Sequence, residues 1–393
     1  MGHMPKLADE LRIIDADTHL TERHDLFTSR APEKYKDRVP RVVDVEGKPF
    51  WVVDDDVQLG PARAGTVIDR NGDKFAFEEC KLNPIEWGIE AAWDPTSRLK
   101  WMDENGFYAQ VLYPNAVGIG GQVLANDVKD PVLRQMCVEI YNDAMAELQD
   151  WSANRFIPMP VMPAWDVDAC VREAERIAAL GFRGVNMTSD PQETGSPDFA
   201  DPAWDPFWDA CQGLQLPVHF HIGASLTSLN FYGKYFWPSQ HQNFRPAIGG
   251  AMLYLNNARV VINSVYAGIF DRFPDLKMVS VESGIGWVPF IMKAADYQIL
   301  ENAPEQAATM SRKPSEYFAH NWYATFWFEA DDDDLQGLID EVGEDNCLFE
   351  TDFPHPTCLY PKPLEAVEAQ MSALRPETRR KVLSENAAAL YRI

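Results

Sequence analysis

The apolar positions of this chain form short runs, and most runs precede a longer segment in which apolar residues recur with helical spacing. We interpret the runs as strands, at residues 11–17, 107–113, 156–159, 182–187, 216–221, 276–281, 322–328 and 347–351. The helical segments lie at residues 131–151, 167–180, 202–212, 246–256, 261–272, 287–300, 333–342, 364–374 and 376–391. Aspartate followed by proline, which favours a helix start, precedes some of them.

This alternation of strand and helix predicts a parallel sheet, and eight repeats predict a (β/α)8 barrel, the TIM barrel. An open doubly wound sheet is the alternative, but no glycine-rich Gly-x-Gly-x-x-Gly follows a strand, which argues against a dinucleotide domain. Residues 28–90 break the pattern and contain a hairpin-like stretch at 41–53. We expect a tag and tail at residues 1–10, then one barrel domain at 11–393 with residues 28–90 inserted after the first strand as a small-sheet subdomain.

The charge and cysteine content narrow the possible partners and the compartment. The chain has 35 basic and 60 acidic residues, a formal charge of −25. Such a surface repels nucleic acid and anionic membranes, so we expect neither as a partner. The six cysteines show no regular spacing, which indicates reduced thiols rather than disulfides. The sequence contains no run of about 18 apolar residues, so we expect no membrane span. We therefore expect a cytoplasmic protein.

The stretch 213–223 carries the first chemical signal, because it is an apolar strand bracketed by glycines and ends in two histidines. Alternation along a strand places His219 and His221 on one face. Both could be ordinary core histidines, but other strand ends also carry metal-binding side chains. These are Asp17 and His19 on the first strand, Glu282 on the sixth, and Glu350, Asp352 and His355 on the eighth. Since the active site of a barrel lies at the carboxyl ends of its strands, these groups could bind one divalent cation.

Four short motifs at these places resemble the amidohydrolase superfamily. They are Asp-x-His on the first strand, Pro-x-x-x-His on the fifth, Phe-Pro-Asp-Leu-Lys before the sixth and Thr-Asp-Phe-Pro-His-Pro on the eighth. More narrowly, they resemble the branch of aminocarboxymuconate-semialdehyde decarboxylase and related metal-dependent hydrolases. The resemblance covers residues 11–25 and 94–390, and the insertion at 28–90 has no counterpart that we can place.

The resemblance implies a metal site made by Asp17, His19, His221 and Asp352, with Asp352 also accepting a proton. Asp17 and Glu282 stand where the family pattern has histidines. Glu282 would then handle protons or be an additional ligand, and Asp17 could instead cap the turn after its strand. We expect one divalent ion, zinc in the first place, with manganese or magnesium as alternatives because oxygen ligands suit them.

Several further positions keep more than one interpretation. We assign His219 a supporting or substrate-contacting role, and His355 is either loop support or a pocket wall. Glu22 and His24 are candidates for the pocket rim. The aromatic segment 231–237 could be core, a pocket wall or a contact in a homodimer, and we expect a homodimer or a higher oligomer.

For function, we expect a metal-dependent, non-oxidative decarboxylase that acts on a small aromatic or unsaturated carboxylic acid. The carboxylate at position 17 and the aromatic loops favour this interpretation. Hydrolysis of an amide, ester or lactone is the alternative, because Glu282 replaces a histidine that decarboxylases of this branch usually keep. A metal-free barrel that serves as a binding protein is the second alternative.

Overall fold

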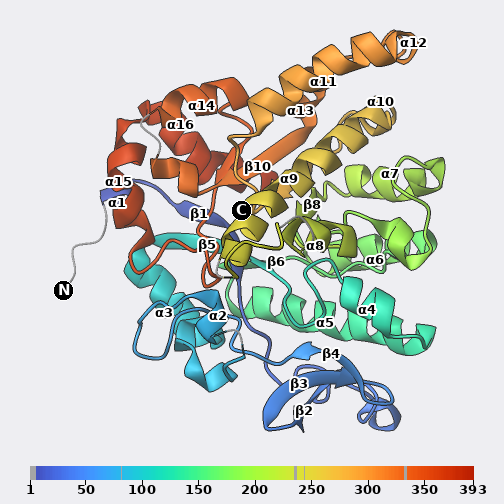
Figure 1. Cartoon of the computed structure of the whole chain (residues 1–393), viewed down its shortest axis with the longest axis vertical. Coiled ribbons are helices and arrows are strands. Elements are labelled where there is room, and N and C mark those ends of the chain that lie inside the picture. The colour runs from blue at the N-terminus through green and yellow to red at the C-terminus, as the bar shows by residue number, and fades with distance from the viewer. Residues whose placement is uncertain (1–5, 81, 234–236, 243, 332–333) are drawn as a thin grey trace.

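The computed structural model describes residues 6–80, 82–233, 237–242, 244–331 and 334–393 (Figure 1). Within these residues, eight parallel strands form the centre of the molecule, and helices surround them. The strands are β1 (Ile13–His19), β5 (Phe107–Tyr113), β6 (Phe156–Pro158), β7 (Val185–Asn186), β8 (Val218–His221), β9 (Met278–Val281), β10 (Trp322–Phe326) and β11 (Cys347–Phe349). None of the described helices has the length and apolar character that a membrane span requires.

The strands close into a barrel through two ladders and two bridging pairs. One ladder has the order β1-β5-β6 and the other β11-β10-β9-β8-β7. The parallel bridge of Val161 with Asn186 joins β6 to β7, and that of Thr18 with Phe353 joins β1 to β11. Buried side chains such as Ile14, Val279 and Leu348 fill the interior below the site. The predicted (β/α)8 fold is therefore confirmed, and the carboxyl ends of all eight strands lie on one rim.

The helices pack on the outer face of the strands and begin where the sequence indicates. The side chains of Asp94, Asp130 and Asp166 accept hydrogen bonds from the first backbone N–H groups of α3, α5 and α6. The helices are α1 (Lys6–Glu10), α2 (Phe77–Cys80), α3 (Pro95–Asn105), α4 (Gln122–Asp127), α5 (Pro131–Trp151), α6 (Val167–Ala179), α7 (Asp205–Gly213), α8 (Leu226–Gly233), α9 (Phe244–Tyr266), α10 (Ile269–Arg272), α11 (Val288–Asn302), α12 (Pro304–Ala307), α13 (Pro314–Asn321), α14 (Leu335–Val342), α15 (Pro363–Ala373), α16 (Pro376–Arg380) and α17 (Asn386–Tyr391).

Two helix predictions need correction. The helices predicted at 246–256 and 261–272 are one long helix, α9, followed by the short α10. Asn257 does not end the helix, because its side-chain amide donates hydrogen bonds to backbone carbonyls at the ends of β8 and β9. The chain turns only at Gly268, whose φ of +67° favours glycine. The helix predicted at 376–391 is divided by a π-helical turn at Lys381–Glu385.

Residues 41–61 form a separate antiparallel sheet at one edge of the molecule (Figure 1). Its strands are β2 (Arg41–Val45), β3 (Lys48–Val53) and β4 (Val57–Pro61). Trp51 and Val53 of β3 belong to the same buried apolar cluster as Val138 and Tyr141 of α5, so the sheet packs on that helix. The division of the chain into tail, barrel and inserted subdomain stays a prediction.

Candidate metal centre

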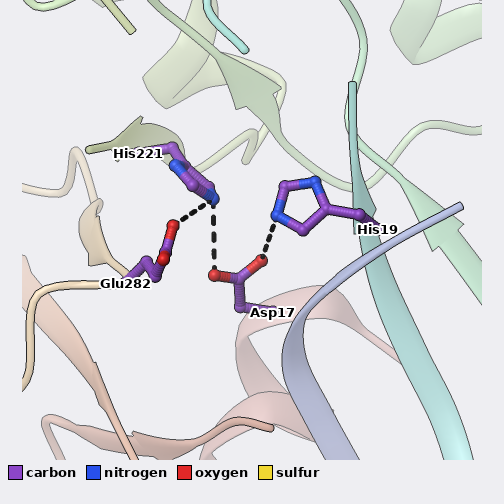
Figure 2. A group of neighbouring side chains, drawn as sticks. All are labelled: Asp17, His19, His221 and Glu282. Atoms are coloured by element: carbon purple, nitrogen blue, oxygen red, sulfur yellow. Dashed lines mark ion pairs between the residues drawn. The ribbon is translucent and has the colours of Figure 1, made fainter. Parts of the chain in front are cut away.

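Three strand ends bring four side chains to one point of the barrel rim. Asp17 and His19 come from the end of β1, His221 is the last residue of β8, and Glu282 directly follows β9. Figure 2 shows that all four side chains point toward one another. Each offers one ligand atom, and these atoms lie within 4.8 Å of one another.

The separations within this group are those of ligands that share an ion. His221 Nε2 lies 3.4 Å from Asp17 Oδ2 and 3.4 Å from Glu282 Oε2, and His19 Nε2 lies 3.6 Å from Asp17 Oδ1. These distances exceed those of good hydrogen bonds. Ligands about 2.1 Å from a tetrahedral ion stand about 3.4 Å apart, so the spacing matches shared coordination.

Asp352 and His355 extend the group from the loop after β11. Asp352 Oδ1 lies 3.8 Å from His19 Nε2 and 3.3 Å from His355 Nδ1. The rings of His355 and His19 are stacked, with their centroids 3.6 Å apart. A second set of potential ligand atoms, from His19, Glu282, Asp352 and His355, therefore overlaps the first. The sequence predicts no ligand role for His355, although its position three residues after Asp352 is a signal for one.

Several of the potential ligand atoms are buried and have no hydrogen-bond partner among the described residues. The buried atoms without a partner include both carboxylate oxygens of Asp17, Oδ1 of Asp352, both ring nitrogens of His19 and Nε2 of His221. His221 Nδ1–H donates to Ile222 O at 2.7 Å, which leaves the lone pair of Nε2 facing the group. Burial of unpaired carboxylates is costly unless a cation compensates them. This set of nitrogen and oxygen donors fits a divalent metal ion.

Burial and mutual repulsion shape the electrostatics of the site. Burial raises the pKa of Asp17 and of Glu282 well above their usual values, and the charge of Asp352 raises both further. Burial lowers the pKa of His221 to about 4 and that of His19 well below its usual value, so both imidazoles are neutral at pH 7. A divalent cation would reverse the carboxylate shifts because it stabilises their charged forms. Crowded carboxylates beside neutral imidazoles are typical of functional sites.

Two of the acidic residues have left-handed backbone conformations that the surrounding strands hold in place. Glu282 and Asp352 both have φ of +54°, which is unfavourable outside glycine. The N–H of Glu282 donates to Thr325 Oγ1 at 2.9 Å, and the N–H of Asp352 donates to Asp17 O at 3.0 Å. Thr357 Oγ1 also donates to Asp352 Oδ2 at 2.8 Å. Thr325 and Thr357 carry no sequence signal that could have identified them.

His219 and Glu350 lie one layer deeper in the barrel than the group. The hydroxyl of Tyr113 is 2.6 Å from His219 Nδ1, and the His219 ring stacks on Tyr391. Glu350 is fully buried, and burial together with the charge of Asp17 raises its pKa well above the usual value. The structure therefore does not bring His219 to the potential ligands, and its predicted role stays a prediction.

The other sequence candidates occupy the surroundings of the site. Glu22 accepts hydrogen bonds from the N–H groups of Asn115 and Ala116 at 2.7 and 3.1 Å, and Asn115 Oδ1 is 3.2 Å from His355 Nε2. The ring of His24 packs against Trp51. Glu22 thus braces a loop that contacts His355. The aromatic segment 231–237 lies partly outside the described residues, at 234–236, and its role stays open.

Comparison with known proteins identifies the family and several relatives of this chain. A family model described as amidohydrolase matches residues 14–393. The chain is 29% identical over 266 residues to gamma-resorcylate decarboxylase of Polaromonas sp. strain JS666. The match covers 65% of this chain and 76% of that protein. It is 23% identical over 265 residues to 2-amino-3-carboxymuconate-6-semialdehyde decarboxylase of Dictyostelium discoideum, 67% of each chain.

Several solved structures with the same fold contain manganese. One of them is a mutant of 5-carboxyvanillate decarboxylase of Novosphingobium aromaticivorans with bound manganese and 3-methoxy-4-hydroxy-5-nitrobenzoic acid. The TM-score is 0.62 at 20% identity, and the match covers 78% of this chain and 83% of that one. The predicted resemblance and the barrel fold are both confirmed by these matches.

Proposed function

The chain belongs to the amidohydrolase family, and from this membership we propose that it is a metal-dependent, non-oxidative decarboxylase of an aromatic or unsaturated carboxylic acid. Its relatives identify it as an enzyme, and both relatives described above are named as decarboxylases. The observation that carries the proposal is the buried group of unpaired carboxylate and imidazole atoms on the barrel rim. This group also disfavours the metal-free alternative, because without a cation the burial of Asp17 and Asp352 has no compensation.

We propose that Asp17, His19, His221 and Asp352 hold one divalent ion. Two carboxylates among the four ligands, and the manganese in the 5-carboxyvanillate enzyme, favour manganese over zinc, and magnesium is the third candidate. When bound, such an ion supplies a positive charge that holds the substrate carboxylate and an adjacent hydroxyl oxygen and polarises them.

Glu282 is the residue to which we assign the role of proton donor, the general acid of the reaction. Its side chain is 13% exposed, whereas those of Asp17, His19 and His221 are at most 1% exposed, so water can restore its proton after each turnover. Glu282 gives this proton to the substrate carbon that bears the carboxylate. The bond from that carbon to the carboxylate then breaks, its electron pair returns to the ring or double bond, and CO2 leaves.

Hydrolysis of an amide, ester or lactone is the second candidate, favoured by the carboxylate of Glu282 in place of the family histidine. Asp352 would then take a proton from the attacking water. The expected homodimer or higher oligomer is compatible with either reaction and stays a prediction.

The test is to load the protein with Mn2+ or Zn2+ and to supply hydroxybenzoates in one assay and aryl esters or lactones in another. We expect CO2 from the hydroxybenzoates and no acid from the esters. Glu282→Gln should keep the metal and reduce CO2 release about 100-fold or more, the usual contribution of a general acid. Glu305→Gln, in the exposed helix α12, is the matched control and should be as active as wild type. Acid formed from esters without any CO2 would establish the hydrolase instead.

A further inference from the structure

Helix α9 crosses the rim of the barrel next to the metal centre. The amide of Asn257, whose residue is 1% exposed, donates to Phe220 O at 2.9 Å, Ser280 Oγ at 3.1 Å and Val281 O at 3.1 Å. These acceptors belong to the ends of β8 and β9, and the next residues along the two strands are His221 and Glu282. Asn257 therefore fixes α9 directly over two members of the group.

Tyr254 stands one helical turn before Asn257, and residues three apart lie on the same helix face. The ring of Tyr254 stacks on Phe328, which lies against the loop that follows Glu282, so the phenol stands beside the metal centre. Burial raises the pKa of Tyr254 well above its usual value, and the hydroxyl therefore keeps its proton. The Tyr254 hydroxyl has no hydrogen-bond partner among the described residues, and its oxygen is accessible to solvent. The hydroxyl is therefore available to a ligand.

The Tyr254 ring belongs to an aromatic cluster that is connected to Asp352 through Thr357. It stacks on Phe328 with centroids 5.5 Å apart and planes at 16°, and it meets Trp327 edge-on at 5.6 Å. Trp327 Nε1 donates to Thr357 O at 3.2 Å, and the hydroxyl of the same Thr357 binds Asp352.

Phe328 lies against the loop that follows Glu282. A Cβ atom added at Gly284 would come within 2.8 Å of Phe328 Cζ. The Phe328 ring can therefore pack against this loop only because residue 284 is glycine. Phe328 is 46% exposed, which is unusual for a phenylalanine packed against two other aromatic rings. An exposed ring beside a buried metal centre offers a flat surface on which a ligand ring can stack.

We propose that Tyr254 and Phe328 select the substrate: the flat ring of a hydroxyaryl acid stacks on their rings, and the Tyr254 hydroxyl donates a hydrogen bond to a substrate oxygen. This inference rests on the proposed function and names the residues that choose an aromatic acid over a saturated one. The proposed ligands Asp17 and Asp352 accept hydrogen bonds when ionised and donate none. An anionic substrate needs a donor beside them, and the Tyr254 phenol supplies one without adding charge.

The experiment compares the binding of 2-hydroxybenzoate and of the saturated 2-hydroxycyclohexanecarboxylate to the metal-loaded protein by calorimetry. We expect wild type to bind the aromatic acid at least about tenfold more tightly. Tyr254→Phe should weaken binding of the aromatic acid about tenfold with unchanged metal content, the loss of one hydrogen bond to a charged group. Phe328→Leu should reduce the preference for the aromatic ring to less than about threefold. Tyr297→Phe, at a site 60% exposed on α11, is the matched control and should bind as wild type does.

The outcomes separate this inference from the proposed function. If wild type shows the ring preference and both variants lose affinity, but no CO2 is ever released, the decarboxylase proposal fails and the selecting role stands. If CO2 is released while Tyr254→Phe and Phe328→Leu keep wild-type affinities, the selecting role alone is overturned. A loss of metal from Tyr254→Phe would also overturn it, because Tyr254 would then support the metal rather than contact the substrate.

Discussion

At the scale of single residues, the site is built from groups that are unstable when buried separately. Asp17 has two unpaired oxygens, and the rings of His19 and His221 both turn Nε2 toward its carboxylate. Each of these groups alone would lower stability, because a buried acceptor without a partner costs about 1–3 kcal/mol. Their arrangement around one point is therefore evidence for function, since packing alone would select apolar side chains here.

Replacing His221 tests whether these residues act together on a metal. His221→Ala should reduce affinity for a divalent ion at least about 100-fold, because it removes a direct ligand while the barrel remains closed. Metal content after dialysis, measured by atomic emission, gives the result, and far-UV circular dichroism checks the fold. His320→Ala, at an exposed position in α13, should bind metal as wild type does. Unchanged metal content in His221→Ala would remove this residue from the ligand set.

Glu22 predicts how stability depends on pH. Burial raises its pKa to about 7 in the folded protein, from 4.5 in the unfolded chain. The folded state therefore binds more protons between these two values, so the contribution of Glu22 to the free energy of unfolding is full below about pH 4.5 and is lost as the pH rises to 7. A shift of this size corresponds to about 3 kcal/mol.

The variant Glu22→Gln has no such titration. The free energy of unfolding of wild type minus that of the variant should therefore fall by up to about 3 kcal/mol between pH 4.5 and 7, and urea titrations at a series of pH values measure it. Any hydrogen bond lost in the variant shifts the difference equally at both ends of the range. A difference that does not change with pH would show that Glu22 has an ordinary pKa.

At the scale of elements, parallel strands and one long helix position the chemistry. The ends of β1, β8 and β9 meet on one rim, and α9 is pinned above the last two by Asn257. The turn after β9 depends on Gly284, whose φ of +69° is unfavourable for other residues. Side chains of the segment after β10 fill the space where a Gly284 side chain would lie.

Two glycine substitutions test this packing. Gly284→Ala should destabilise the protein by about 2 kcal/mol or more, because the added Cβ meets Phe328 and Glu329 Oε1 and the backbone is left-handed. Gly250→Ala, inside α9, is the control: nothing lies within 4 Å of its added Cβ, and alanine favours a helix by about 1 kcal/mol. Denaturant unfolding of both variants measures the difference. Equal stabilities would contradict the close packing at Gly284.

At the scale of the whole molecule, the proposed ligands come from the first and last thirds of the chain and from the strand between them. Asp17 and Asp352 stand at opposite ends of the sequence, and β1 meets the segment after β11 where the barrel closes. An ion that bridges them would bind the folded barrel far more tightly than the unfolded chain. Metal binding should therefore stabilise the entire domain rather than one loop.

Metal removal measures this linkage. Free metal at about 1,000 times its dissociation constant should add about 4 kcal/mol to the free energy of unfolding, and a chelator should remove this gain. Thermal melts with Mn2+ and with EDTA give the result for wild type. In His221→Ala the gain at the same metal concentration should fall to about 1.4 kcal/mol or less, because its affinity for the ion is at least about 100-fold weaker. A melting temperature of wild type that does not respond to either addition would contradict a metal that closes the barrel.

How much the sequence reveals depends on how local each signal is. The positions of the eight strands, and the placement of Asp17, His19 and His221 at strand ends, follow from apolar runs and alternation within a few residues. Alternation along the strand cannot distinguish His219 from His221, since both side chains face the barrel interior. Only the position of each residue along the barrel axis places His219 below the site and His221 in it. The single helix α9 was also out of reach, because Asn257 is held by strands that are distant in sequence.

The sequence by itself determined the barrel and the residue types at its rim, since both depend on periodicity and on short motifs read along one strand. The tertiary structure alone decided that His355 joins the group, that Asn115 and Thr357 support it, and that Tyr254 and Phe328 stand beside it. The physical reason is that these contacts join segments far apart in the chain, and their distances exist only after the strands close into a barrel.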